Sequence, residues 1–190
     1  MKNNQFIEVY DNLIPTDLSN YLENFILTDS QIPFQYIEDL TYPLSSPHRR
    51  YKPGICYNVI NTNLYLQSTI IPTISFNILY RLGIHKNIII TTVPLARIFV
   101  DLPTPNPQPD FPPHTDSKVP HWVCLYYVND SDGDTVFFDD DNNEIKRVSP
   151  KKGRIAFFDG SILHCGTPSD TRSRAVINFN FTGEKLGEEK

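Results

Sequence analysis

The second half of the chain consists of short runs of strand-forming residues separated by turn-forming residues, and this pattern restricts the fold more than any other feature of the sequence. The runs are 88–93, 96–101, 121–129, 135–139, 144–148, 154–158 and 174–181. The connections are rich in Asp, Asn and Gly, as in 129–133, which is typical of antiparallel strands. Seven or eight such strands usually close into a barrel or a jelly roll. We therefore expect a mainly β fold.

The N-terminal half predicts a strand at 6–10 and two helices that support one sheet. The first helix has Thr16 as its N-cap, and the second begins near Pro72 and ends at Gly83. Their apolar positions recur every three or four residues, so each helix buries one face. These positions are Leu18, Tyr21, Leu22, Phe25 and Ile26 in the first helix, and Ile74, Ile78 and Leu82 in the second. Residues 36–60 show no pattern that predicts an element.

Length and composition indicate one domain. A chain of 190 residues can bury a full core, and 12% aromatic residues argue against disorder. Sixteen Pro and eight Gly favour short elements with stiff connections. We expect a single domain over 1–190, with a strand and supporting helices in 1–94, a β core in 95–182 and a tail in 183–190.

Charge and cysteine content exclude several classes of protein. The net charge is -5 and no basic run occurs, so we expect no nucleic-acid partner. Three cysteines without CxxC spacing indicate neither a disulfide framework nor a Cys-based zinc site, and they favour a reducing compartment. The absence of a leader or a spanning segment predicts a cytoplasmic protein without a membrane partner. The oligomeric state stays open.

A metal site is indicated by the tripeptide His114-Thr115-Asp116, which follows a proline-rich segment, 103–113. In an extended chain, residues two positions apart project to one face, so an imidazole and a carboxylate would point to a common place. His164 is the best candidate for a third ligand. Two His and one Asp hold Fe(II) on one side and leave adjacent positions open for a co-substrate and dioxygen.

An arginine near the C-terminus provides a second part of the site. Arg174 opens an alternating run in which Val176, Asn178 and Asn180 share its face. An arginine inside a barrel is costly unless it is paired, and a dicarboxylate would be its partner. Arg172, two residues earlier, is the alternative.

These residues resemble the 2-oxoglutarate- and Fe(II)-dependent oxygenases, and within them the prolyl 4-hydroxylase-like branch. The resemblance covers residues 97–181. It rests on the segments 114–116, 122–129, 133–138 and 150–158, and on His164 and Arg174. It implies a double-stranded β-helix, iron held by His114, Asp116 and His164, and the distal carboxylate of 2-oxoglutarate bound by Arg174 and Tyr126.

The resemblance also implies the cofactors and the reaction. The cofactors are Fe(II), the co-substrate 2-oxoglutarate and O2, with ascorbate as a candidate reductant. The reaction is hydroxylation of an unactivated C–H bond with release of succinate and CO2, on a prolyl or another protein side chain. The alternatives are an oxygenase acting on a small metabolite or free amino acid, a non-catalytic cupin-like module that binds a metal or an acid, and a zinc hydrolase.

Three features remain open at this level. His121 is a rival metal ligand, although its place at the start of an expected strand favours a structural role. The basic segment 49–52 is interpreted as surface, with a substrate groove as the alternative. We expect residues 36–60 and 102–113 to carry substrate specificity.

Overall fold

Two helices and ten strands are present within residues 5–28, 32–40, 52–61, 70–104 and 112–187, the parts of the chain that the computed structural model describes. In chain order they are β1 (Ile7–Tyr10), α1 (Thr16–Thr28), β2 (Gln35–Ile37), β3 (Gly54–Asn61), α2 (Ile70–Lys86), β4 (Ile88–Asp101), β5 (Trp122–Tyr127), β6 (Thr135–Phe138), β7 (Glu144–Val148), β8 (Ile155–Asp159), β9 (Leu163–Gly166) and β10 (Arg174–Lys185).

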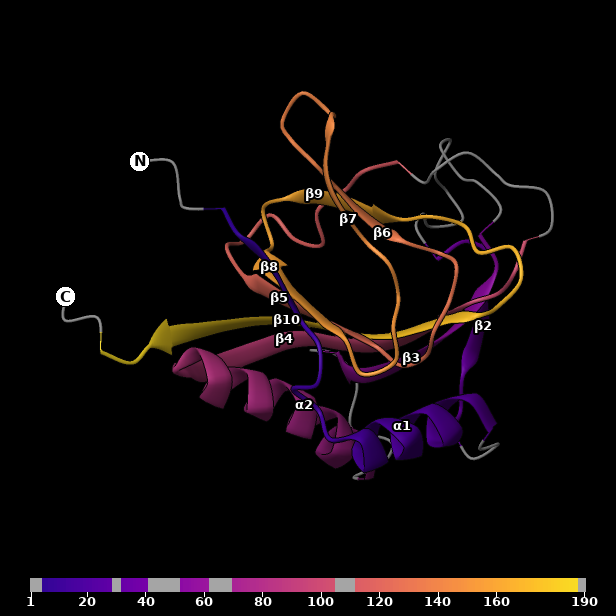
Figure 1. Cartoon of the computed structure of the whole chain (residues 1–190), viewed down its shortest axis with the longest axis horizontal. Coiled ribbons are helices and arrows are strands. Elements are labelled where there is room, and N and C mark those ends of the chain that lie inside the picture. Colours follow the sequence, from indigo (N-terminus) through magenta and orange to yellow (C-terminus); the bar gives the residue numbers. More distant parts are fainter. Residues whose placement is uncertain (1–4, 29–31, 41–51, 62–69, 105–111, 188–190) are drawn as a thin grey trace.

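The strands form two antiparallel sheets. The larger has seven strands in the order β1-β8-β5-β10-β4-β3-β2, and the smaller has three in the order β7-β6-β9. Figure 1 shows the smaller sheet on one side of the large sheet and both helices on the other. Strand β10 lies at the centre, because it pairs with β4 on one edge and with β5 on the other. The predicted mainly β fold with two supporting helices is confirmed.

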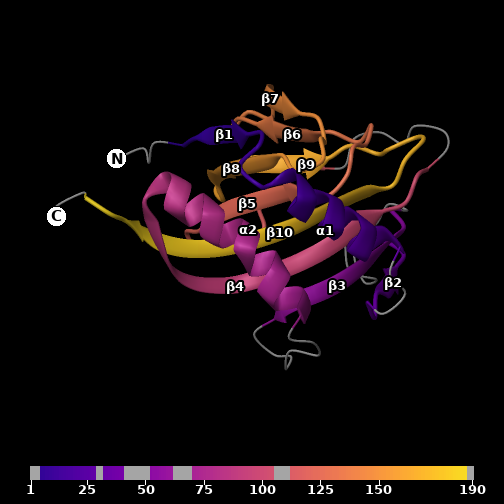
Figure 2. The ribbon, with the colours of Figure 1, turned by 60° about the horizontal axis from the view of Figure 1, so that its bottom comes forward.

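The helices cover the outer face of the large sheet, as Figure 2 shows. Alternate residues of the central strands point toward them, among them Ile177 and Phe179 of β10. Leu22 of α1 and Ile78 of α2 are fully buried in this main core. The three-to-four periodicity thus predicted the buried helical positions, except that Tyr21 is 49% exposed.

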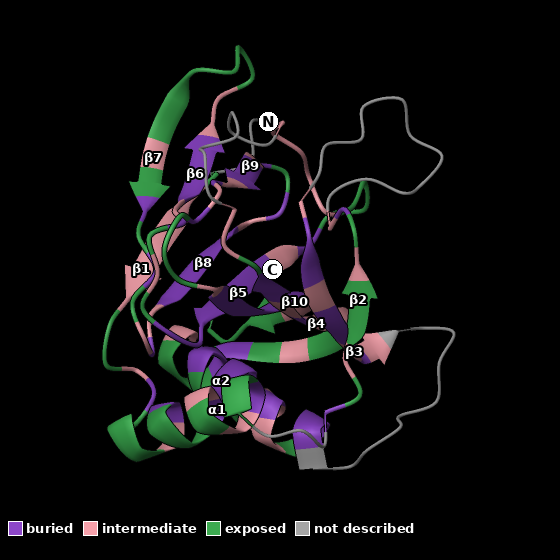
Figure 3. Cartoon of the chain, turned by 90° about the vertical axis from the view of Figure 1, so that its right-hand side faces the viewer, coloured by how far each residue is buried: buried purple, intermediate pink, exposed green. Residues whose placement is uncertain are grey.

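The other face of the large sheet looks toward the small sheet and forms a second core. Leu125, Tyr127, Phe158 and Val176 point into it from the large sheet, and Phe137 points into it from the small sheet. In Figure 3 the strands on both sides of this interior are largely buried, whereas β7 is mostly exposed. The interior opens at one end into the pocket described below.

Three elements differ from the sequence-based expectation. Helix α2 continues beyond Gly83 to Lys86, and it ends before Asn87, whose φ is 52°. The expected strands 88–93 and 96–101 are one strand, β4, because Pro94 lies on an exposed stretch where the pairing with β10 shifts register. Strand β10 extends to Lys185, into the segment expected to be a tail.

Other parts of the expectation concern residues 36–60 and the cysteines. Strand β3 lies in that unassigned segment and pairs with β4, whereas residues 41–51 and 105–111 lie outside the described residues.

All three cysteines are free and buried. Within the described ranges, neither helix is long and apolar enough to cross a membrane.

Replacement of Phe157 should destabilise the protein strongly. Its side chain is 1% exposed and its ring lies 4.8 Å from that of Phe6 and 6.0 Å from those of Trp122 and Phe181. Phe157→Ala should lower the free energy of unfolding by about 3 to 5 kcal/mol, measured by denaturant titration. The control Tyr80→Ala, at a position that is 65% exposed, should change it by less than about 0.5 kcal/mol. A loss below about 1 kcal/mol for Phe157→Ala would contradict this core.

The ion pair between Asp11 and Arg154 should make stability depend on pH. Arg154 donates two hydrogen bonds, of 2.8 and 3.0 Å, to the Asp11 carboxylate, and these lower the pKa of Asp11. A lowered pKa in the folded state stabilises the protein above the ordinary pKa, and the contribution is lost as the pH falls through the folded value. Because Asp11 is 35% exposed, we expect Asp11→Asn to cost only about 0.5 kcal/mol at pH 7.

Denaturant titrations at several pH values check this effect. The difference between wild type and Asp11→Asn should shrink as the pH falls below about 3.9, the ordinary pKa of an aspartate. The control Asp140→Asn, at the exposed tip of the β6–β7 hairpin, should show no such change. An equal cost of Asp11→Asn at pH 7 and at pH 3 would show that the ion pair is not its origin.

Candidate metal centre and its pocket

The backbone places the imidazoles of His114 and His164 side by side. The amide of each residue donates to the carbonyl of the other, both at 3.0 Å, so His114 extends the small sheet beyond β9 as an isolated antiparallel bridge. Residues directly opposite each other in an antiparallel pair project to the same face. The two ring centroids are accordingly 5.1 Å apart. Two histidines separated by 50 positions thus meet through main-chain pairing.

Both imidazoles are oriented by the same local contact. Nδ1 of His114 lies 3.3 Å from the carbonyl oxygen of Pro112, and Nδ1 of His164 lies 3.0 Å from that of Ile162. Each Nδ1–H can donate to the carbonyl two residues earlier, which leaves the lone pair on Nε2. A carbonyl on the far nitrogen is how metal-binding histidines are usually held. The two Nε2 atoms are therefore available as ligand atoms.

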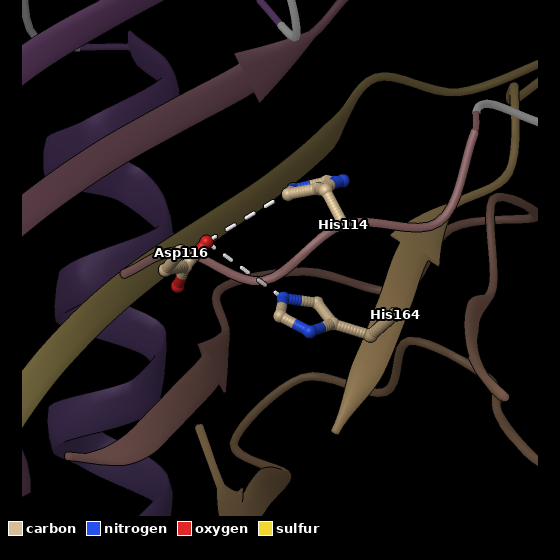
Figure 4. Close-up of side chains that lie close together, drawn as sticks. All are labelled: His114, Asp116 and His164. Atoms are coloured by element: carbon tan, nitrogen blue, oxygen red, sulfur yellow. Dashed lines mark ion pairs between the residues drawn. The ribbon is translucent and has the colours of Figure 1, made fainter. Parts of the chain in front are cut away.

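The third group is Asp116, which faces both rings (Figure 4). Its Oδ1 lies 4.0 Å from Nε2 of His114 and 3.8 Å from Nε2 of His164, and the three ligand atoms lie within 4.8 Å of one another. Its Oδ2 accepts a 3.0 Å hydrogen bond from Nδ2 of Asn178, which turns Oδ1 toward the histidines. Two imidazole nitrogens and one carboxylate oxygen that converge in this way fit a divalent transition metal such as Fe(II).

Local electrostatics favour the protonation states that bind a metal. Burial acts to raise the pKa of Asp116, but attraction to His164 and the hydrogen bond from Asn178 outweigh it and hold that pKa below its ordinary value. Burial lowers the pKa of His164, although Asp116 acts in the opposite direction. Asp116 is therefore an anion and His164 is neutral near pH 7, as metal ligation requires.

The three residues line a cavity of about 440 Å³ between the two sheets. Apolar side chains form much of its wall, namely Leu95, Phe99, Val123, Leu125, Phe158 and Val176. Phe158 packs edge-on against the ring of His164, with the centroids 4.9 Å apart. The wall therefore restricts water around His164, whose side chain is 10% exposed, whereas that of His114 is 42% exposed. A few polar groups are left to contact a ligand.

Arg174 lies in the same cavity and is 5% exposed. Its guanidinium lies 3.2 Å from Oδ2 of Asp101, donates to Oγ1 of Thr135 at 2.7 Å, and stacks 5.7 Å from the centre of the Tyr127 ring. Arg172 is exposed and does not line the cavity. Of the two candidate arginines, the structure therefore brings only Arg174 together with the histidines.

Tyr126, which was expected to bind the distal carboxylate of 2-oxoglutarate together with Arg174, lies on the other face of β5 and does not line the cavity. Tyr126 pairs across β10 with Ile177 and belongs to the main core under the helices. Its neighbour Tyr127 points the other way, and its hydroxyl donates to Oγ1 of Thr135 at 2.7 Å. Since successive strand residues alternate in direction, a shift of one position decides which tyrosine lies next to Arg174.

Sequence reasoning missed two basic residues that line the cavity. Lys52, expected at the surface, has its Nζ 3.8 Å from Oδ2 of Asp101, and burial lowers its pKa. Arg97 lines the wall from the middle of β4. The alternation of Leu95, Arg97, Phe99 and Asp101 could have indicated Arg97. Lys52, which lies just before β3, is placed by pairing between segments distant in sequence and by its bridge to Asp39.

His121, the rival ligand, is not part of this cluster. Its Nδ1 lies 2.7 Å from the carbonyl oxygen of Val119, and its ring packs directly on Gly160. A Cβ at Gly160 would lie 2.3 Å from Nε2 of His121, so only glycine leaves room for the ring. Among the residues that the structure describes, the group able to hold a metal consists of His114, Asp116 and His164.

Comparison with known proteins gives a match to one family model over part of the chain and a fold over nearly all of it. Residues 105–182 match the family model described as the 2OG-Fe(II) oxygenase superfamily, where 2OG is 2-oxoglutarate. No curated protein matches the chain in sequence.

Solved structures resemble nearly the whole chain. A prolyl hydroxylase from Trichoplax adhaerens, in complex with a peptide fragment of hypoxia inducible factor, has a TM-score of 0.62 at 15% identity, with 92% of this chain and 82% of that chain covered. An oxidoreductase of the 2OG-Fe(II) oxygenase family from Burkholderia pseudomallei has a TM-score of 0.66 at 10% identity, covering 95% and 88%. A Pseudomonas putida prolyl-4-hydroxylase has a TM-score of 0.55 at 13% identity, covering 97% and 95%. The expected double-stranded β-helix is thus confirmed.

Removal of one imidazole should strongly weaken metal binding. His164→Ala should weaken binding of Fe(II), or of Co(II) as a spectroscopic substitute, by at least about 100-fold in equilibrium dialysis, because two ligands remain of three. The control His85→Ala removes an exposed histidine of α2 and should leave the affinity unchanged. Equal metal binding by wild type and His164→Ala would show that the ion binds elsewhere.

Proposed function

We propose that this chain is a 2OG-Fe(II) oxygenase, because residues 105–182 match the model of that superfamily. We propose further that it hydroxylates an unactivated C–H bond of a peptidyl proline or another protein side chain. When bound, Fe(II), 2-oxoglutarate and O2 supply the oxidation, and 2-oxoglutarate is converted to succinate and CO2. The chain itself holds the ligands, seats the co-substrate and presents one C–H bond.

The observation that carries this proposal is the convergence of His114, Asp116 and His164 in a cavity that also contains Arg174. We assign the metal to the two Nε2 atoms and to Oδ1 of Asp116. The backbone bridge between the histidines and the hydrogen bond from Asn178 hold these atoms in place before the metal arrives. Such prior positioning reduces the cost of binding.

The charge around Arg174 supports a carboxylate as its ligand. Nζ of Lys52 and the guanidinium of Arg174 both lie near Oδ2 of Asp101, at 3.8 and 3.2 Å, and the buried Asp39 also acts on Lys52. Nε of Arg174 is buried without a hydrogen-bond partner. A buried donor is costly unless it is paired, and the distal carboxylate of 2-oxoglutarate would fit beside this guanidinium, with Thr135 and Tyr127 next to it.

The peptide substrate is supported by the fold that this chain shares with two prolyl hydroxylases, one of them solved with a peptide. The runner-up is a free amino acid or another small metabolite. A non-catalytic cupin-like module is not favoured, because the matching family is one of oxygenases. We extend the proposal to a cytoplasmic location, which the three free, buried cysteines support.

The experiment that tests this function measures co-substrate binding and turnover separately. Under anaerobic conditions, Fe(II) and 2-oxoglutarate should together produce a weak visible charge-transfer band, which Asp116→Ala abolishes. With O2, wild type should release succinate. No band at saturating Fe(II) and 2-oxoglutarate would contradict the proposal.

Titration of this band with 2-oxoglutarate should also locate the co-substrate. Arg174→Gln should raise the Kd for 2-oxoglutarate by at least about 30-fold, since it removes a buried charge partner, and Arg174→Lys should raise it less. Arg172→Gln and Tyr126→Phe should leave it within about twofold, because neither side chain lines the cavity. Similar effects of Arg172→Gln and Arg174→Gln would overturn the assignment of Arg174.

A further inference from the structure

A row of polar side chains crosses the large sheet at the other end of the cavity from Arg174. Asn58 of β3 lies directly opposite Arg97 of β4, and Arg97 lies directly opposite Asn178 of β10. Cross-strand neighbours have Cβ atoms about 5 Å apart and share a face. Because Asn178 also donates to Asp116, the row adjoins the metal ligands directly.

Arg97 has no acceptor in this row. No carboxylate within the described residues pairs with it, its guanidinium donates no hydrogen bond there, and its Nε is buried without a partner. The Oδ1 atoms of Asn58 and Asn178 are also buried and unpaired. A guanidinium presents five N–H donors, and a buried donor that stays unsatisfied costs about 1 to 3 kcal/mol. The row is therefore incomplete without a ligand.

The charged side chains of the cavity indicate that this ligand is an anion. Its wall contains three cationic side chains, Lys52, Arg97 and Arg174, and two carboxylates, Asp101 and Asp116. Asp101 lies near both Lys52 and Arg174, Asp39 also acts on Lys52, and Asp116 belongs to the candidate metal cluster. Arg97 is the cation of this wall that no carboxylate of the described residues pairs with, and its Nε is buried without a partner. An anionic group with two oxygens would match its planar fork.

Strand geometry separates this arginine from the co-substrate carboxylate. Arg97 lies opposite Asn178 and Asp101 lies opposite Arg174, so the two pairs are four residues apart along β4 and β10. Four strand residues span about 13 Å. The metal ligand Asp116 is bound to the Arg97 end through Asn178. Arg97 therefore faces the part of the cavity where a substrate would lie beside the metal site.

We propose that Arg97 binds a carboxylate of the substrate and thereby selects acidic substrates. This inference rests on the proposed function and adds a chemical requirement to it: the C–H bond to be hydroxylated lies in a molecule whose carboxylate reaches Arg97. That carboxylate can come from a free amino acid or from an Asp or Glu side chain next to the target residue of a peptide. Asn58 and Asn178 flank Arg97 on the two neighbouring strands.

Matched acids and amides test the proposal. The probes are L-proline against L-prolinamide, and the blocked peptide acetyl-Asp-Pro-Gly-amide against acetyl-Asn-Pro-Gly-amide.

Binding is measured by calorimetry with the full-length protein loaded with Co(II) and 2-oxoglutarate. Turnover is measured as succinate release above the rate without probe. In at least one pair the acid should bind wild type at least about tenfold more tightly than the amide, as expected for a charge-assisted hydrogen bond. The pair that shows the preference identifies the source of the carboxylate.

Variants of Arg97 separate this role from a structural one. Arg97→Met should abolish the preference for the acid and raise its KM, whereas Arg97→Lys should keep part of the preference. Both should leave the Kd for 2-oxoglutarate within about twofold. The matched control Arg81→Met removes the same charge from the exposed surface of α2 and should change nothing.

Two results would overturn the inference. One is the absence of any difference between acid and amide in both pairs with wild type. The other is a rise in the Kd for 2-oxoglutarate in Arg97→Met, which would place Arg97 at the co-substrate. Failure of the proposed function is recognised independently, because the anaerobic band and the release of succinate without a substrate do not involve Arg97.

Discussion

The site depends on one backbone interaction, the reciprocal pair of hydrogen bonds between His114 and His164. This bridge joins the segment that follows the first four strands to strand β9 of the small sheet, and it sets both imidazoles on one face. The contact of each Nδ1 with the carbonyl two residues earlier then fixes which nitrogen is free. Asp116, two residues after His114, needs only an extended backbone and the hydrogen bond from Asn178 to complete the set. The ligand geometry is thus mostly a consequence of main-chain pairing.

The large sheet separates stability from chemistry by its two faces. On β10, Ile177 and Phe179 pack under the helices, whereas Arg174, Val176 and Asn178 line the cavity. The same alternation places Tyr126 in the core and Tyr127 beside Arg174. The helices consequently hold the sheet from behind without contributing to the lining of the cavity. Substitutions on the two faces should therefore affect different properties of the protein.

Sequence reasoning predicted what depends on local pattern. The helical faces, most strands, and His114 and Asp116 of the candidate metal cluster were identified because periodicity and the short HxD spacing are local properties. His164 was named as a distant candidate and through the family resemblance. It failed where the outcome depends on pairing between distant segments. Strand β3 has no clear pattern of its own and is defined by its pairing with β4, so the approach of Lys52 to Asp101 could not be foreseen. The family resemblance assigned Tyr126 to the co-substrate, but the expected strand 121–129 did not state which face each residue takes, and the structure places Tyr126 in the main core.

Strand β3 also bears on which stretch of chain forms a complete pocket. The family match begins at residue 105, and the expected β core begins at 95, yet Leu40 and Lys52, which line the cavity, belong to the segment that precedes both. Part of the cavity wall therefore comes from the residues that lead into β3, the strand that pairs with β4 on its other edge. A fragment limited to the matching region would keep the histidines but lose that wall and expose the edge of the sheet to water. Transfer of this site to another protein would consequently require the segment that contains Leu40, Lys52 and β3 as well as the residues of the candidate metal cluster.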